Sequence, residues 1–110
     1  MAEIQTRERE GIVIIDFSGS LSLGYDSAFL RDEIAAALSR GRTGMVLNLE
    51  KATYLDSSWL GAIVNAFMNL SRAGGQLKLL SLPPRIMDLL VMTKLSVVFD
   101  IFTSEERCRE

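Results

Sequence analysis

Histidine is absent from this 110-residue sequence, and cysteine occurs once, at Cys108. Catalysis by a Ser-His-Asp or Cys-His arrangement is therefore excluded, and so are most zinc sites, because these need imidazoles or several thiolates. A single cysteine also cannot form a disulfide within the chain. Glycine-rich phosphate loops and carboxylate clusters are missing as well. We therefore expect a binding protein with no catalytic residue, no metal and no cofactor, rather than an enzyme.

Basic tracts and long apolar runs are also lacking. Twelve lysines and arginines stand against 14 aspartates and glutamates, so the formal net charge is −2. Direct nucleic-acid binding is not expected, because it needs clustered lysine and arginine. The longest apolar runs fall far short of the ~20 residues of a membrane span, and no apolar segment typical of a signal peptide follows Met1. A cytoplasmic location is expected.

The sequence does contain an ordinary globular composition, 48% hydrophobic and 24% charged, which predicts one domain over residues 1–110. Apolar and β-branched runs predict strands at 4–9, 12–17, 45–49, 77–80 and 97–102. Helical periodicity predicts helices at 25–40 and 58–72, a third that opens at Pro83-Pro84, and a short last one capped by Thr103 and Glu106. This order predicts an α/β fold: one mixed, mostly parallel sheet with an N-terminal hairpin and about four helices.

Three finer expectations concern a loop and the core. Residues 19–24 are expected to form a loop. The apolar face of the 58–72 helix is expected to comprise Leu60, Ile63, Val64, Phe67 and Met68. Four methionines are expected to fill the core: Met45, Met68, Met87 and Met92.

The segment from Tyr54 to Gly61 joins a buried strand to a strongly periodic helix. The start of a helix carries unpaired backbone N–H groups and partial positive charge. Ser57 is therefore either the N-cap of this helix or a serine to which a phosphate can be added. Ser58 is expected to be a solvated residue of the first turn more readily than a second phosphorylation site.

Two neighbours of Ser57 have alternative roles. Asp56 either favours the helix start electrostatically or contacts a partner. Trp59 either packs on Ala62 and Ala66 or is an exposed anchor for a partner, and we favour partner contact because tryptophan is enriched at interface hot spots. Ser22 and Tyr25 either support the turn and the next helix start or share one rim with Ser57.

The order of elements, together with Asp56-Ser57-Ser58-x-Leu60-Gly61, resembles the STAS domain. More narrowly, the chain is similar to the single-domain anti-sigma-factor antagonists of bacteria, which typically show Asp-Ser-Ser-Gly-Leu-Gly at this point. Four weaker features agree with the resemblance: Leu47-Asn48-Leu49, Ala73-Gly74-Gly75, Pro83-Pro84 and the tail from Phe102 to Glu106.

The resemblance implies a regulatory cycle. Ser57 would be phosphorylated by an anti-sigma-factor serine kinase of the histidine-kinase-like ATPase fold, and a serine phosphatase would reverse the reaction. The unphosphorylated antagonist would bind that kinase and free a sigma factor. Asp56, Ser58, Trp59, Ser22 and Tyr25 would belong to the partner surface. Whether the free protein is a monomer or a homodimer stays open.

The chain departs from the family pattern at two positions. Trp59 replaces the glycine that follows the serine pair, and Ser22 replaces the aspartate of a Gly-x-Leu-Asp segment, here Gly19-Ser20-Leu21-Ser22. Both positions fall on the surface that would meet the kinase. The alternative function is a non-catalytic STAS scaffold, either in a stressosome-like assembly or in a lipid-transport complex.

Overall fold

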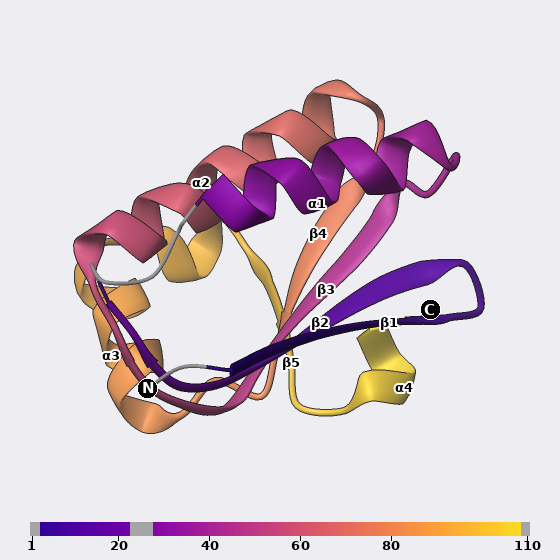
Figure 1. Ribbon diagram of the computed structural model, residues 1–110. Helices are drawn as coiled ribbons and strands as arrows, with labels where there is room; N and C mark the ends of the chain where they lie inside the picture. The colour runs from indigo at the N-terminus through magenta and orange to yellow at the C-terminus, as the bar shows by residue number, and fades with distance from the viewer. Residues whose placement is uncertain (1–2, 23–27, 109–110) are drawn as a thin grey trace.

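The computed structural model describes residues 3–22 and 28–108 and confirms the predicted α/β class. A five-stranded sheet has the strand order β1-β2-β3-β4-β5, and helices cover its faces (Figure 1). The strands are β1 (Glu3–Arg9), β2 (Ile12–Leu21), β3 (Gly44–Leu55), β4 (Gln76–Leu80) and β5 (Asp100–Phe102). The helices are α1 (Ala28–Ser39), α2 (Ser57–Arg72), α3 (Pro84–Met92), the 3-10 helix η1 (Leu95–Val97) and α4 (Glu105–Cys108).

The sheet is mixed, as the alternation of strands and helices predicts. β1 and β2 form the antiparallel N-terminal hairpin, and the pairs β2–β3, β3–β4 and β4–β5 are parallel. Parallel neighbours require crossover connections, and α1, α2 and α3 supply them. The carboxyl end of the central strand β3 therefore leads directly into α2.

Strands β2 and β3 both run further than the sequence predicts. Residues 19–21 belong to β2 rather than to a loop, and β3 continues from Leu49 to Leu55. The pairing of β2 with β3 shifts register twice, between Asp16 and Ser18 and between Gly19 and Ser20. Such irregularities break the alternation of apolar residues, and the long pairing nevertheless ends with Leu21 opposite Leu55.

The main core lies between one face of the sheet and the helices α1 and α2, which run side by side over it (Figure 1). Alternate residues of β2 face this layer: Val13, Ile15 and Phe17 are buried in the main cluster. Ile14 points to the opposite face, where it forms a smaller cluster with Val46 and Leu80.

Helix α4 is held near that second face by ion pairs. The Arg7 guanidinium of β1 lies 2.6 Å from an Asp16 carboxylate oxygen of β2 and 2.8 Å from a Glu105 carboxylate oxygen of α4. The bond from Arg7 holds the pKa of Asp16 below its ordinary value, and a bond donated by Asn48 acts in the same sense. The two carboxylates in turn raise the pKa of Arg7.

The ends of α2 and α3 follow the local signals in the sequence. Pro84 is the first residue of α3 and Pro83 caps it, as predicted. Helix α2 ends at Arg72, and the backbone N–H of Gly75 donates to the carbonyl of Leu70 at 2.7 Å. A Cβ at Gly75 would collide with the backbone carbonyl oxygen of Thr43.

Three expectations about elements and side chains are corrected. The predicted strand over 97–102 is shorter, because η1 ends at Val97, a turn follows at residues 98–99, and β5 begins at Asp100. Met92 is 80% exposed and Met68 is also exposed, so neither fills the core. The inward side of α2 comprises Trp59, Ile63, Ala66 and Leu70. Leu60, Val64 and Phe67 are only partly buried against the core.

Candidate functional site

The turn between β3 and α2 is anchored by Asp56. Its backbone is extended, its side-chain Oδ1 accepts a hydrogen bond from the backbone N–H of Trp59 at 2.9 Å, and it is therefore the N-cap of α2. Its own N–H donates to the carbonyl oxygen of Leu21 at 3.0 Å, which ties the turn to the end of β2. The interpretation of Ser57 as the N-cap is thus wrong, because Asp56 takes that role.

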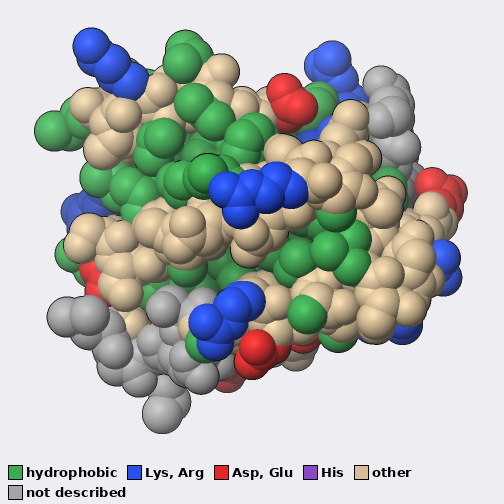
Figure 2. Space-filling view, turned by 90° about the horizontal axis from the view of Figure 1, so that it is seen from above, with side chains coloured by type: hydrophobic (Ala, Val, Ile, Leu, Met, Phe, Trp, Pro, Cys, Tyr) green, Lys and Arg blue, Asp and Glu red, His purple; other side chains and the backbone are tan. Residues whose placement is uncertain are grey.

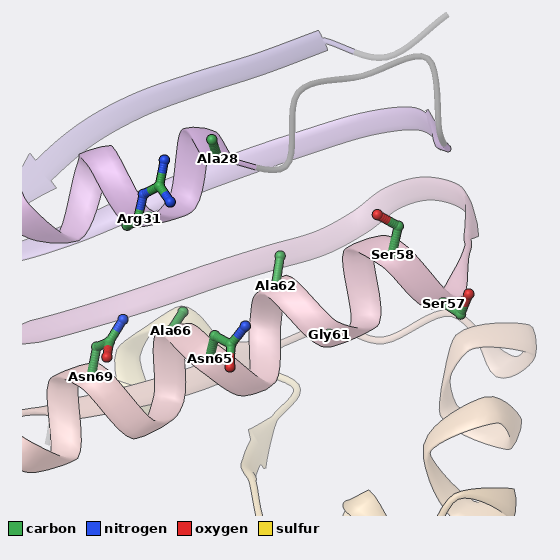
Figure 3. Close-up of a pocket in the computed structure, with 9 residues that line it drawn as sticks. All are labelled: Ala28, Arg31, Ser57, Ser58, Gly61, Ala62, Asn65, Ala66 and Asn69. Atoms are coloured by element: carbon green, nitrogen blue, oxygen red, sulfur yellow. The ribbon is translucent and has the colours of Figure 1, made fainter.

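Ser57 and Ser58 are the first two residues of α2, and both are exposed. Figure 3 shows their side chains leaving the helix in different directions. Ser58 extends on the side of α2 that faces α1, whereas Ser57 lies at the start of α2, beside α3 (Figure 3). A hydroxyl at position 57 is accessible from solvent while the backbone that carries it is held by the Asp56 cap.

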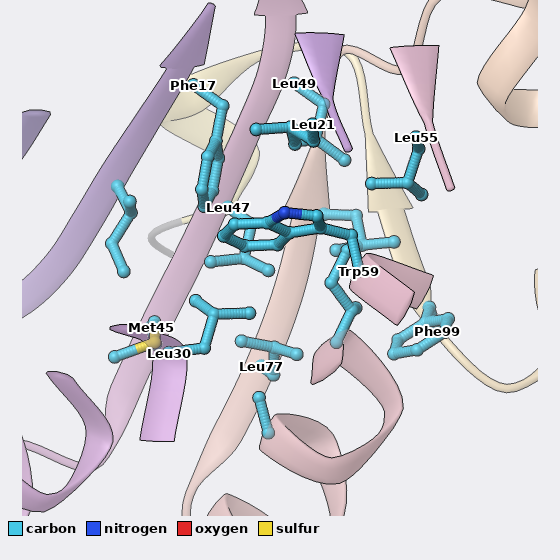
Figure 4. Close-up of a cluster of buried hydrophobic side chains, with 14 of the residues drawn as sticks. Phe17, Leu21, Leu30, Met45, Leu47, Leu49, Leu55, Trp59, Leu77 and Phe99 are labelled. Carbon is cyan, nitrogen blue, oxygen red and sulfur yellow. The ribbon is translucent and has the colours of Figure 1, made fainter. Parts of the chain in front are cut away.

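Trp59 is a core residue and not an exposed anchor. Its side chain is 0% exposed, and its ring meets the ring of Phe17 edge-on, with centroids 5.7 Å apart at an interplanar angle of 77°. Figure 4 shows the indole among aliphatic side chains from the sheet, including Leu47 and Leu21. The assignment of Trp59 to a partner surface is therefore corrected, because no partner reaches a fully buried ring.

A groove of about 610 Å³ lies between the start of α2 and the helix α3, with Ser57 at its rim. Its apolar lining includes Tyr54, Leu60, Ile86, Leu89 and Met92. Arg85 and Asp88 of α3 contribute the charged part of the lining together with Asp56. The groove is thus mainly apolar, with charges near the serine.

Several large apolar side chains stand exposed around this groove and beyond it. Tyr54, Val91 and Met92 are exposed at or beside the groove, and Val97 and Val98 follow in and after η1. In the view from above, hydrophobic side chains gather towards one side of the molecule (Figure 2). Contiguous exposed apolar surface is typical of interaction sites.

A second hollow, of about 510 Å³, separates α1 from α2. Ser57, Ser58, Arg31, Asn65 and Asn69 supply its polar lining, and small residues of α1 and α2 complete it (Figure 3). The guanidinium of Arg31 lies 4.0 Å from the carboxylate of its neighbour Asp32. Ser57 therefore borders both hollows, one mainly apolar and one mainly polar, whereas Ser58 borders only the polar one.

Ser22 follows Leu21, whose carbonyl accepts the N–H of Asp56, so Ser22 lies close to the start of α2. It is half-buried. Tyr25 lies outside the described residues. The structure thus brings Asp56, Ser57, Ser58 and the end of β2 together at one end of the sheet.

The contribution of α3 to this site is not predicted by the sequence patterns. Arg85 is not singled out, and Met92 is assigned to the core, although Val91 and Met92 fall off the apolar stripe of Ile86 and Leu90 and are both exposed. Over residues 3–22 and 28–108, no three Cys, Asp or Glu side chains are grouped so as to hold a metal ion. None of the described helices is long and apolar enough to cross a membrane.

The family model for the STAS domain matches residues 3–108. The chain belongs to the STAS domain family. Among curated STAS relatives, an anti-sigma-B factor antagonist of Bacillus subtilis (strain 168) is 26% identical over 103 residues, which cover 94% of this chain and 93% of that protein. The family resemblance drawn from the Asp56-Ser57-Ser58 segment is thereby confirmed.

Solved structures show the same STAS fold. An anti-sigma factor antagonist from Mycobacterium paratuberculosis superposes with a TM-score of 0.83 at 15% identity, covering 98% of this chain and 91% of that one. The Bacillus cell fate determinant SpoIIAA in its phosphorylated form superposes with a TM-score of 0.75 at 22% identity, covering 96% and 95%.

Proposed function

We propose that this STAS domain is an anti-sigma-factor antagonist: a binding module without catalysis that docks an anti-sigma-factor serine kinase and releases it when Ser57 is phosphorylated. The observation that carries the proposal is the position of Ser57. Its side chain is exposed at the rim of an apolar groove, whereas its neighbours Asp56 and Trp59 hold the helix start and the core. The similarity to an anti-sigma-B factor antagonist supplies the class of partner.

The switch follows from the charge of the phosphate. A phosphoserine carries about −1.5 to −2 charges at neutral pH. A partner surface fitted to the neutral hydroxyl of Ser57 would have to desolvate that anion. A penalty of about 2.8 kcal/mol already weakens binding about 100-fold. No refolding of the domain is needed, because Ser57 is exposed and is not one of the buried core residues.

The apolar groove supplies the contact area in this proposal. Tyr54, Leu89 and Met92 offer apolar surface next to the serine, and Val91 extends it along α3. Burial of such residues stabilises a complex by about 25 cal/mol per Å² of apolar surface before the costs of association. A kinase that docks here would therefore contact the surface that carries Ser57. Return to the binding form would require a serine phosphatase.

A second candidate is a non-catalytic scaffold in a larger assembly. The observation that favours it is the identity of residue 22. The family resemblance leads us to expect a carboxylate at this position beside the site, and the chain has Ser22 instead. A scaffold would use the same exposed apolar surface to bind further copies or other STAS domains. It would not require transfer of phosphate to Ser57.

The experiment uses the purified protein, ATP and a purified anti-sigma-factor kinase of the histidine-kinase-like ATPase fold from the same organism. Mass spectrometry is expected to find one added phosphate on Ser57 in the wild type and in the matched control Ser58→Ala, and none in Ser57→Ala. Calorimetry is expected to show tight kinase binding by Ser57→Ala and at least 100-fold weaker binding by Ser57→Asp.

Two outcomes would contradict the proposal. Equal kinase affinities for the wild type and Ser57→Asp would remove the charge switch. Large assemblies in light scattering, with no phosphate uptake, would favour the scaffold instead, and the same measurement decides between a monomer and a homodimer.

A further inference from the structure

Arg85 is the basic residue of the groove that Ser57 shares. It is the second residue of α3, its side chain is exposed, and it lines the same 610 Å³ hollow as Ser57. Among the described residues, no carboxylate lies within 4.0 Å of its guanidinium, although Asp88 follows one turn later on the same helix. Its charge is therefore available to an anion that appears in the groove.

We propose that Arg85 binds the phosphate of phosphorylated Ser57 across this groove, so that the modification closes the docking groove from within the domain. This inference rests on the proposed function, in which Ser57 is the phosphoacceptor. It adds a receptor for the phosphate that belongs to the chain itself. Arg85 is then part of the switch and not only of the docking surface.

The chemistry favours arginine for this role. A guanidinium presents a planar set of N–H donors that matches two oxygens of a phosphate, and such charge-assisted hydrogen bonds are about twice as strong as neutral ones. Ser57 lies at the start of α2 beside α3 (Figure 3), and Arg85 lies in the first turn of α3. The phosphate and the guanidinium would therefore meet over the apolar floor of the groove.

Other charged groups lie near Ser57, and they determine which control the test needs. Asp56 caps α2 and Asp88 lines the groove, and both repel a phosphate. Arg31 lines the hollow on the other side of Ser57, where its guanidinium lies 4.0 Å from Asp32. Arg31 is thus the alternative residue that could bind the phosphate in place of Arg85, and it serves as the matched control.

Closure has a consequence for the partner. In the unmodified protein, the apolar side chains of Leu89 and Met92 and the cation of Arg85 are all accessible to a docking protein. With the phosphate bound, the mouth of the groove is occupied by a polar pair, and the free cation is lost. Phosphorylation would then remove both an apolar contact and a charge contact, in addition to adding negative charge.

The test installs phosphoserine at position 57 during translation by stop-codon suppression, so that no kinase is needed. The titration of the phosphate is followed by ³¹P NMR between pH 4 and pH 8 in the wild type, Arg85→Gln and Arg31→Gln, after circular dichroism has shown that all three fold. A nearby cation favours the dianion, so Arg85 lowers the second pKa of the phosphate from its usual value near 6. Arg85→Gln is therefore expected to raise the titration midpoint by at least about 0.5 pH unit, and Arg31→Gln to leave it unchanged.

The inference is overturned if Arg85→Gln titrates like the wild type, or if Arg31→Gln produces the shift instead. This result is independent of the proposed function. If no kinase modifies Ser57, the proposed function fails while the NMR titration still decides the role of Arg85. If the kinase modifies Ser57 and the titration does not shift, only the role of Arg85 fails.

Discussion

Replacement of Trp59 by alanine is expected to lower the free energy of unfolding by about 3–5 kcal/mol. The side chain is fully buried and packs edge-on against Phe17. Its removal therefore leaves a cavity between the sheet and α2 that the surrounding strands cannot close (Figure 4). Domains of this size are stable by about 5–15 kcal/mol, so the variant is expected to fold but to be marginal.

A second variant separates the loss of volume from the loss of the ring. Trp59→Phe keeps an aromatic side chain beside Phe17 and removes only the outer part of the indole, so we expect a loss of about 1–2 kcal/mol. The neighbouring Ser58→Ala is the matched control. It changes an exposed residue of the same turn and is expected to shift stability by less than about 0.5 kcal/mol.

Urea unfolding followed by far-ultraviolet circular dichroism measures these differences without relying on the tryptophan signal. A loss of 1 kcal/mol lowers the melting temperature of a domain this small by about 4–8 °C, so Trp59→Ala is expected to melt roughly 12–40 °C lower. The reasoning is refuted if Trp59→Ala unfolds within about 1 kcal/mol of the wild type and instead loses kinase binding. Trp59 would then contribute to the partner surface, contrary to its burial.

Three other predictions concern the helix ends and the sheet. Gly75→Ala is expected to lower the free energy of unfolding, measured in urea, by about 1–3 kcal/mol, because its Cβ collides with a backbone carbonyl. At Gly61 a Cβ meets nothing within 4 Å, so Gly61→Ala is expected to stabilise α2 by up to about 1 kcal/mol. Asp56→Ala is expected to cost about 0.5–2 kcal/mol through loss of the N-cap bond, with Asp56→Asn close to the wild type; equal melting temperatures for all three would contradict the cap. The pKa of Asp16 is lowered in the folded state, so its contribution to stability is present above about pH 4 and is lost as the pH falls through the folded pKa. The difference in unfolding free energy between the wild type and Asp16→Asn should therefore shrink from pH 7 to pH 3. A constant difference would count against the ion pair with Arg7.

Much of the fold follows from the sequence because strong local signals agree with the packing. The buried runs of β2, β3 and β4, the helix periodicity and the Pro83-Pro84 start of α3 predict the mixed sheet that the structure has. The ends of β2 and β3 do not follow. Their last residues pair across two register shifts, and an interrupted alternation cannot be distinguished from a loop in one sequence.

The burial of Trp59 is indicated by helical spacing in the sequence, although the enrichment of tryptophan at interfaces favours the opposite interpretation. Trp59, Ile63, Ala66 and Leu70 recur at spacings of four, three and four residues, the period of one inward side of a helix. The stripe that begins at Leu60 is also apolar and runs beside it. Both stripes contact the core, but only the first is fully buried, and the choice between them depends on where α1 packs.

The groove at Ser57 could not be predicted from the sequence because its two walls are far apart in the chain. Tyr54 and Leu60 come from the β3–α2 junction, whereas Arg85 and Met92 come from α3. Only the parallel pairing of β3 with β4 brings α3 beside the start of α2. The motif alone identifies the serine, whereas the charged residues that share its groove depend on the topology.

The first three residues of α2 have different surroundings because their side chains point in different directions around the helix axis. Successive residues of an α-helix point about 100° apart, since one turn takes 3.6 residues. Ser57 therefore lies beside α3, Ser58 on the side of α1 and Trp59 in the core, although the three are consecutive (Figures 3 and 4). A charge added at position 57 is thereby directed away from the buried indole, so the surface can change while the helix start is held by Asp56 and Trp59. Tryptophan in place of the family glycine is compatible with this arrangement, because its position is the one of the three that points inward.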